Sequence, residues 1–431
     1  MAESIGIVGL GYVGTPLATA FSASGYRVFG FDIDQDTVER LQQDLETPVE
    51  LPSTRSSLAV YEQRLEVSTD PQPLADCDVI ITTVPTPLTD DSMPDMSIVE
   101  TAGQTIGEHI SPGTTAVLES TVFPGATRGI FAPAIEQTSG LVAGEDFDIG
   151  YSPERLTPGG DHELRNSVKP VSAADNGVRD VLEDLYSTVV EETFPAPSIE
   201  SAEAAKCLEN VQRDVNIALI NEFAMACSAV DGLDYEDVLS VAETKWNFHR
   251  YRPGLVGGHC IPIDPYYLIY ELERHGGSTP LMRQARSTNE SLVEFVAGMV
   301  EEAMTERKRA GNSDHTDRIL VCGLSYKPNA DDLRSAANES LFEALAERGY
   351  EVVGYDPYVD ETAAAETFGI DVWSSIDERV PSALLMLANH DEFTHLSLEG
   401  IVDRYPTPPA VIDVPRLFDD PTRSDIVYRR L

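Results

Sequence analysis

The order of apolar and polar positions along the chain predicts two blocks of alternating strands and helices, separated by a long helical stretch. Short apolar runs that end in Gly, Pro or Thr alternate with helical patterns, as expected for parallel strands buried on both faces. In the first block we expect strands within residues 5–8, 27–34, 78–87, 114–125 and 147–156. Residues 198–230 follow a long helical period, and a second strand–helix–strand unit is expected within residues 318–357.

This order predicts an α/β protein with two Rossmann-like, doubly wound domains joined by a central helical domain. The expected boundaries are residues 1–197, 198–300 and 301–431, since a chain of 431 residues is too long for one small core. No apolar run approaches the roughly 20 residues of a membrane helix. The first residues enter an apolar strand without a basic leader, so we expect a cytoplasmic protein with no membrane partner.

The charge balance narrows the range of partners. Asp and Glu total 73 against 30 Lys and Arg, for a formal net charge of −43. The acidic residues are spread over segments of ordinary apolar content, so they do not indicate disorder, and they argue against a nucleic-acid partner. Such self-repulsion destabilises a compact state in dilute salt and is screened in molar salt. The composition therefore resembles that of a cytosolic protein from a salt-accumulating halophile.

The first predicted strand leads into a glycine-rich turn that is typical of dinucleotide binding. The turn contains Gly9, Gly11 and Gly14, a helix follows it, and Asp32 ends the next strand. The glycines permit a tight turn and a close approach of the pyrophosphate to the helix N-terminus. A carboxylate at Asp32 would accept from a ribose 2′-OH and favours NAD over NADP. The alternative is a Rossmann-like turn that binds nothing.

Polar residues follow the later strands, at the edge where ligands of such sheets bind. Thr86 and Thr121 are expected near the cofactor or the reacting carbon, and Glu154 ends a further strand at the same edge. The alternative for each threonine is a helix cap or a turn hydroxyl.

The long helix carries a polar stripe of its own. Lys206, Asn210 and Arg213 recur at i, i+4 and i+7 on one face, which either lines a site or is a solvated edge. A helix of this length is also suited to packing against a copy of itself, so we expect a homodimer. In the second α/β unit, Lys327 and Arg334 lie beyond a strand end, where a phosphate would bind.

Cys260 differs from the other four cysteines. Cys77, Cys207, Cys227 and Cys322 lie in apolar or helical contexts that favour core packing. Cys260 stands in GLVGGHCIPIDP, between glycines and prolines, so it is either a small buried residue at a kink or a thiol held for chemistry. No CxxC pair or histidine cluster indicates a metal site.

Together these segments resemble the UDP-glucose/GDP-mannose dehydrogenase family. The motifs run in order along essentially the whole chain: GLGYVG, VPTP, ESTVFPG, SPERL, ExxKxxENxxR, PGLVGGHCIPIDPYYL and YKPNADDLR. The resemblance implies an NAD-dependent enzyme that oxidises the C6 alcohol of a nucleotide sugar to a carboxylate, passing two hydrides to two NAD+ in turn. The aldehyde level is captured by a thiolate as a thiohemiacetal, whose oxidation gives a thioester that water hydrolyses.

The resemblance also implies roles for individual residues. Cys260 is the expected nucleophile, Lys206 and Asn210 would stabilise the oxyanion, and Asp264 would orient the Cys–Lys pair or a water. Glu154 and Thr121 would position the hydrolytic water. The implied NAD site comprises Gly9, Gly11, Tyr12, Val13, Gly14, Asp32, Thr86, Thr121 and Arg334. Contacts with the UDP-sugar are implied for Arg155, Leu156, Lys206, Asn210, Arg213, Gly254, Gly257, Lys327 and Arg416.

Local departures within these motifs bear on the substrate. In SPERLTPGG, Pro158 stands where UDP-glucose enzymes carry a second glutamate, and TKWNFHRYRPGLVGGHC looks closest to the branch acting on UDP-N-acetylglucosamine or -galactosamine. Arg334 is followed by Ser-Ala, where the family motif reads Arg-x-Ser. Arg416 is the third residue after Asp413, one residue later than in the family's common Asp-x-Arg motif.

We therefore expect a UDP-N-acetylhexosamine 6-dehydrogenase that makes a uronic acid donor for surface glycans. UDP-glucose 6-dehydrogenase is the alternative within the family. A two-electron hydroxyacid dehydrogenase would leave GGHCIP and the third domain unexplained. A non-catalytic nucleotide-sugar sensor predicts the loss of a catalytic residue, and none is missing here.

Overall fold

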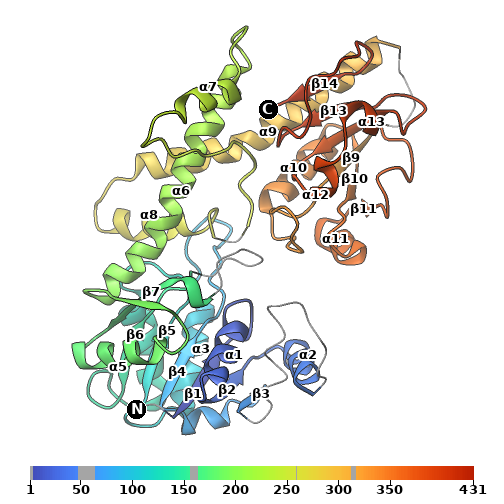
Figure 1. Cartoon of the computed structure of the whole chain (residues 1–431). Coiled ribbons are helices and arrows are strands. Elements are labelled where there is room, and N and C mark those ends of the chain that lie inside the picture. The colour runs from blue at the N-terminus through green and yellow to red at the C-terminus, as the bar shows by residue number, and fades with distance from the viewer. Residues whose placement is uncertain (1–2, 47–63, 156–163, 259, 312–316) are drawn as a thin grey trace. The chain divides into compact units, whose positions relative to one another are not determined.

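The computed structural model describes residues 3–46, 64–155, 164–258, 260–311 and 317–431. The chain forms two compact units, the first comprising residues 1–209 and 263–278 and the second comprising residues 210–262 and 279–431. The division falls inside helix α6 (Ile199–Cys227), shown in green in Figure 1. Within the described ranges, no helix combines the length and apolar character needed to cross a membrane.

The first unit is built on an eight-stranded sheet ordered β3-β2-β1-β4-β5-β6-β7-β8. Neighbouring strands are parallel except for β6 and β7, which are antiparallel. The strands are β1 (Ser4–Val8), β2 (Arg27–Phe31), β3 (Leu65–Ser68), β4 (Val79–Thr82), β5 (Thr115–Leu118), β6 (Asp148–Tyr151), β7 (Val168–Ala173) and β8 (Glu192–Pro195). The order of the first six strands is that of a doubly wound dinucleotide-binding domain, which confirms the predicted α/β class.

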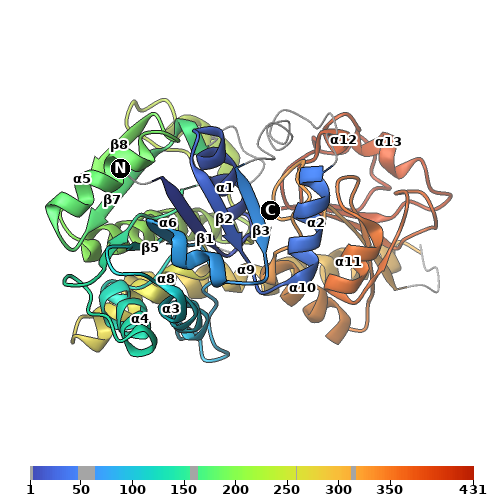
Figure 2. The same cartoon turned by 90° about the horizontal axis from the view of Figure 1, so that it is seen from below.

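Helices cover the sheet of the first unit. They are α1 (Gly14–Ala23), α2 (Gln35–Glu46), α3 (Ser97–His109), α4 (Ala132–Ser139), α5 (Asn176–Tyr186), the first part of α6, and α8 (Asp264–Arg274). Ile5 and Ile7 of β1 pack in one apolar cluster with Leu17 of α1 and Leu182 of α5. Helices α3 and α4 lie side by side (Figure 2). The predicted strands are thus present: β1 covers its whole predicted run, whereas β2, β4, β5 and β6 end before their predicted runs do, because those runs continue into the loops that follow.

The second unit contains a six-stranded, all-parallel sheet ordered β11-β10-β9-β12-β13-β14. Its strands are β9 (Arg318–Cys322), β10 (Glu351–Tyr355), β11 (Asp371–Val372), β12 (Ala383–Met386), β13 (Ala410–Asp413) and β14 (Tyr428–Arg430). Its helices are the remainder of α6, α7 (Tyr235–Ala242), α9 (Pro280–Arg309), α10 (Ala336–Glu347), α11 (Glu361–Phe368), α12 (Asp391–Thr394) and α13 (Leu398–Val402). Ile319 and Val321 pack toward α9 and α10, while Leu320 and Cys322 join the opposite cluster.

The two sheets repeat the same local geometry at the end of their first strand. Gly9 after β1 and Gly323 after β9 both have φ of 93°. The next residue in each turn donates its N–H to an aspartate that follows the adjacent strand, from Leu10 to Asp32 at 2.6 Å and from Leu324 to Asp356 at 2.7 Å. This repetition confirms the prediction of two Rossmann-like folds.

Candidate active site

The turn between β1 and α1 is shaped by its glycines. A side chain at Gly14 would place its Cβ 1.8 Å from the carbonyl oxygen of Gly9, so the fold itself requires glycine there. Apart from its chain neighbours, a Cβ at Gly11 would meet no atom of the described residues within 4 Å, so they leave the space above Gly11 open. Helix α1 begins without a side-chain cap at Val13, and Tyr12 is 60% exposed. An open glycine cradle at an uncapped helix N-terminus fits the pyrophosphate of a dinucleotide.

Asp32 stabilises this turn by hydrogen bonds and also lies where a ribose would bind. Its carboxylate accepts N–H bonds from Leu10 at 2.6 Å and from Asp34 at 3.0 Å. Each carboxylate oxygen can accept more than one bond, so a ribose hydroxyl remains a compatible partner. Thr83, which the sequence reasoning missed, donates to the Gly9 carbonyl at 2.8 Å from the end of β4.

The two predicted threonines occupy the carboxyl edge of this sheet. Thr86 is buried, and its side chain shares a hydrogen bond with Tyr267 of α8. Thr121 is partly exposed, in the loop that follows β5. That loop is held by the buried Glu203 of α6, which accepts from the backbone N–H groups of Gly125 and Thr127.

Glu154 and Lys206 come together in the first unit. The Lys206 Nζ lies 3.7 Å from Glu154 Oε2, and the two side chains are 8% and 14% exposed, respectively. Among the described residues, Glu154 Oε1 is buried and has no hydrogen-bond partner. Burial raises the pKa of Glu154 above its ordinary value, while Lys206 and then Lys169 oppose the rise and Glu119 adds to it. A buried carboxylate with an open oxygen beside an ammonium group is suited to holding a water or a substrate hydroxyl.

Asp264 opens α8 and is buried in the same unit. It contributes, after burial itself, to raising the pKa of Cys207, the neighbour of Lys206 on α6. This coupling places the Asp264 carboxylate close to the part of α6 that carries Lys206. Asn210 and Arg213 follow on the same helix, and Arg213 is exposed.

Cys260 belongs to the second unit and is exposed, whereas Cys77, Cys207, Cys227 and Cys322 are buried. The prediction of four packing cysteines and one exception is confirmed, and the alternative of a buried kink residue is wrong.

The loop before Cys260 is fixed by contacts that the sequence did not reveal. Asn221 of α6 accepts from the Gly254 N–H at 2.8 Å and donates to the Gly254 carbonyl at 3.2 Å. A Cβ at Gly257 would lie 2.7 Å from Ser335 Oγ, so glycine permits the loop to pack closely there. Gly258, with φ of 82°, donates its N–H to the Arg334 carbonyl at 2.9 Å.

Several of the predicted site residues lie near Tyr326, as their effects on its pKa indicate. Burial raises its pKa first, Asp332 and Cys260 add to the rise, and Arg334 and Arg213 oppose it. The Arg334 guanidinium, predicted to reach NAD, binds Asp332 through Nε at 2.8 Å and Nη2 at 2.6 Å. Lys327 is partly exposed in the same turn, and its carbonyl accepts from Ser325. Cys260, Arg213 and the turn after β9 thus share one neighbourhood.

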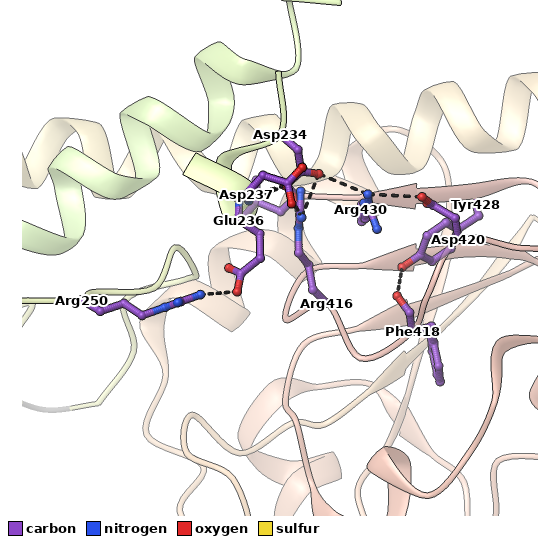
Figure 3. A network of polar contacts seen from close by, with 10 residues as sticks. Asp234, Glu236, Asp237, Arg250, Arg416, Phe418, Asp420, Tyr428 and Arg430 are labelled. Carbon is purple, nitrogen blue, oxygen red and sulfur yellow. Dashed lines mark hydrogen bonds and ion pairs between the residues drawn. The ribbon is translucent and has the colours of Figure 1, made fainter. Parts of the chain in front are cut away.

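Arg416 lies in an ionic network within the second unit (Figure 3). Its Nη1 binds both carboxylate oxygens of Asp234, at 2.7 and 3.0 Å, and its guanidinium lies 4.1 Å from the centre of the Tyr235 ring. Arg430 binds Asp234 at 3.1 Å. The predicted contact between Arg416 and the UDP-sugar would therefore compete with Asp234, and it stays a prediction.

The remaining predicted residues follow the SPER motif. Arg155 donates to the Val168 carbonyl at 2.9 Å and forms an ion pair with Glu209 of α6. Leu156 and Pro158 lie outside the described residues, so the contacts implied by SPERLTPGG stay predictions. No group of His, Cys, Asp or Glu in the described part of the chain has the arrangement of a metal site.

Comparisons with known proteins cover most of the chain. Residues 3–190, 200–291 and 320–420 match the NAD binding domain, the central domain and the UDP binding domain of the UDP-glucose/GDP-mannose dehydrogenase family. The chain is 36% identical to the UDP-N-acetyl-D-glucosamine 6-dehydrogenase of Pseudomonas aeruginosa, over 98% of each chain. It is 34% identical to the enzyme of the same name from Salmonella typhi, over 92% of each. The solved UDP-D-ManNAc dehydrogenase from Pyrococcus horikoshii matches with a TM-score of 0.86 and 30% identity, covering 99% of this chain and 98% of that one.

The fold and the nucleotide turn define an NAD-dependent oxidoreductase with two Rossmann-like folds. The matches to all three domains go further, because they run in the same order and cover most of the sequence. The chain belongs to the UDP-glucose/GDP-mannose dehydrogenase family and is an NAD-dependent nucleotide-sugar dehydrogenase.

Proposed function

We propose that the protein oxidises the C6 hydroxymethyl group of a UDP-N-acetylhexosamine to a carboxylate in two NAD+-dependent steps, with Cys260 as the covalent nucleophile. The observation that carries the chemistry is the buried Glu154–Lys206 pair, whose Glu154 Oε1 has no partner among the described residues. The N-acetylated substrate is supported by the names of relatives, which act on UDP-N-acetyl-D-glucosamine and UDP-D-ManNAc.

The proposed reaction uses the residues of the chain as follows. The Gly9–Gly14 turn would hold NAD+, which would supply the hydride acceptor for each oxidation. At the aldehyde level, the Cys260 thiolate adds to C6, a C–S bond forms, and the oxyanion is stabilised by the Lys206 ammonium and the Asn210 amide. The second oxidation leaves a thioester on Cys260, and Asp264 orients the Lys206 side chain throughout.

Hydrolysis of the thioester completes the cycle. Water adds to the acyl carbon, Glu154 takes the proton of the water with help from Thr121 in positioning it, and the C–S bond breaks to return the Cys260 thiolate. A carboxylate kept away from solvent and raised in pKa is a better proton acceptor than an exposed one.

Initial rates with UDP-glucose, UDP-GlcNAc, UDP-GalNAc and UDP-ManNAc, measured in molar KCl with NAD+, test the substrate. We expect the highest kcat/KM for an N-acetylated sugar and a much lower value with NADP+ because Asp32 repels the 2′-phosphate. A preference for UDP-glucose would replace the substrate while keeping the reaction, and no NADH from any of the four sugars would refute the proposed function.

We further propose a homodimer, in the cytoplasm of a halophile, that supplies uronic acid donors for surface glycans. The dimer is supported by Leu208 and Leu219 of α6, which are 53% and 63% exposed and eleven residues apart, hence on one helical face. The halophile is supported by the net charge of −43. Light scattering of the protein in molar KCl tests the dimer, and a monomeric mass would refute it.

A further inference from the structure

A buried ion pair in the first unit has no role in the reaction as proposed so far. The Lys169 Nζ of β7 lies 2.7 Å from Oε2 of Glu119, the residue that follows β5. The two side chains are only 3% and 1% exposed. Tyr186 of α5 donates its hydroxyl to the other oxygen of Glu119 at 2.5 Å. Burying two charges is costly, and a hydrophobic pair of similar volume often serves stability as well, so the pair calls for a role beyond packing.

The ammonium group of Lys169 also reaches the backbone that leads to Glu154. Its Nζ lies 3.3 Å from the carbonyl oxygen of Pro153 and 3.5 Å from that of Ser152. Ser152 is tied to β7 a second time, because its hydroxyl donates to the Pro170 carbonyl at 2.7 Å. The segment directly before Glu154 is therefore held by one strand, at the point where that strand carries the buried charge.

The same pair contributes to the field around Glu154. The charged groups that face Glu154 from the elements packed against it are Lys206 on α6, Lys169 on β7 and Glu119 after β5. Lys206 and Lys169 favour the ionised carboxylate and Glu119 disfavours it, so the two members of the buried pair act in opposite directions.

We propose that Lys169, held in place by Glu119, is a positioning residue for thioester hydrolysis, acting through the Ser152 and Pro153 carbonyls to fix the Glu154 carboxylate where it receives the proton of the attacking water. The inference rests on the proposed function. In the step it serves, the water oxygen bonds to the acyl carbon, the proton passes to Glu154, and the C–S bond breaks with the electron pair returning to Cys260.

Lys169→Met removes the contacts with the carbonyls and leaves Glu119 as a buried carboxylate. The double variant E119Q/K169M removes both charges, so it keeps the folded state testable if the single variant does not fold. Lys308→Met is the matched control, because this lysine of α9 is 48% exposed and pairs with Asp317, whose side chain is equally exposed. Far-UV circular dichroism and gel filtration in molar KCl establish that each variant is folded.

Rapid mixing of each variant with NAD+ and the preferred UDP-sugar separates oxidation from hydrolysis. Both Lys169 variants should form NADH in a fast burst and then turn over about 100-fold more slowly than wild type, since misplacing a catalytic group by about 1 Å has that effect. The burst rate and the KM values for sugar and NAD+ should stay within about twofold of wild type. Lys308→Met should match wild type in both phases.

The pH profile separates position from charge. In Lys169→Met the acid limb of steady-state turnover should move to higher pH. The Lys169 cation, which lowers the pKa of Glu154, is then gone, while the Glu119 carboxylate that raises this pKa remains. In E119Q/K169M the limb should return toward the wild-type pH while the slow hydrolysis remains. If Lys169→Met reduced the burst rate and the steady-state rate by the same factor, or if E119Q/K169M hydrolysed the thioester at the normal rate, the role of Lys169 would be refuted. Either result would leave the proposed function intact. A wild-type protein that forms no NADH from any UDP-sugar would overturn the proposed function and this inference with it.

Discussion

Replacing Asp234 should weaken the second unit more than any ordinary surface substitution. The Asp234 side chain is 25% exposed, accepts N–H bonds from Glu236 and Asp237 at the start of α7, and binds Arg416 and Arg430. Burial on its own would raise its pKa, but the hydrogen bond from Arg416 and those from the α7 backbone lower the pKa to about 2. Asp234 is thus both the cap of a helix and the centre of the network in Figure 3.

The lowered pKa gives the magnitude. A folded-state pKa of about 2, against 3.8 for the exposed carboxyl, corresponds to about 2 kcal/mol of stability from the ionised form. Salt screening reduces this figure in molar KCl because the group is partly exposed. Asp234→Asn keeps the cap and should lose most of the 2 kcal/mol, and Asp234→Ala should lose about 1 kcal/mol more with the cap.

The pH dependence has a definite sign. Because the folded-state pKa is depressed, the contribution is complete above 3.8 and disappears as the pH falls through about 2. The destabilisation by Asp234→Asn, measured by urea unfolding, should therefore be largest near neutral pH and shrink in acid. Asp420→Asn is the matched control, since the Asp420 side chain is 71% exposed and pairs with the same Arg430 at 3.3 Å. Equal unfolding midpoints for Asp234→Asn and Asp420→Asn would refute the reasoning.

Three further outcomes follow from the site and the charge. Cys260→Ser should stop turnover and leave the sugar at the aldehyde level, whereas the control Cys227→Ser, at a buried packing position, should keep the reaction. Normal turnover by Cys260→Ser would show that Cys260 is not the nucleophile. Asp32→Ala should raise the KM for NAD+ far more than that for the sugar, and equal rises would count against the ribose contact. Transfer to about 0.1 M ionic strength should inactivate or unfold the protein, as measured by circular dichroism and by the rate of NADH formation. Full activity at this ionic strength would contradict the halophile proposal.

Much of the fold was predictable because its signals are local. The Gly9 turn, the aspartate after the second strand and the apolar runs each indicate a helix, strand or turn from a few neighbouring residues. The helix predicted over residues 198–230 is α6, Ile199–Cys227. Cys260 was also separable from the other cysteines because its neighbours are glycines and prolines, which are incompatible with a packed helix or strand.

The supporting contacts of the site were not predictable, because they join residues far apart in the chain. Lys169 and Glu119 are 50 residues apart, Asn221 and Gly254 are 33 apart, and Asp234 and Arg416 are 182 apart. No local pattern distinguishes Lys169 in an apolar strand, or Asn221 in a long helix, from a residue of no consequence. The motifs in the sequence predict which residues contact the substrate, but only the packed strands and helices reveal what holds those residues in place.

The central claim is that one site carries C6 through both oxidations by way of Cys260. The most direct test is the amount of NADH formed per molecule of UDP-sugar consumed, in molar KCl with sugar limiting. We predict two NADH per sugar, with an acyl adduct on Cys260 detectable by mass spectrometry after rapid quenching. One NADH per sugar, with free aldehyde as product and no adduct, would contradict the account.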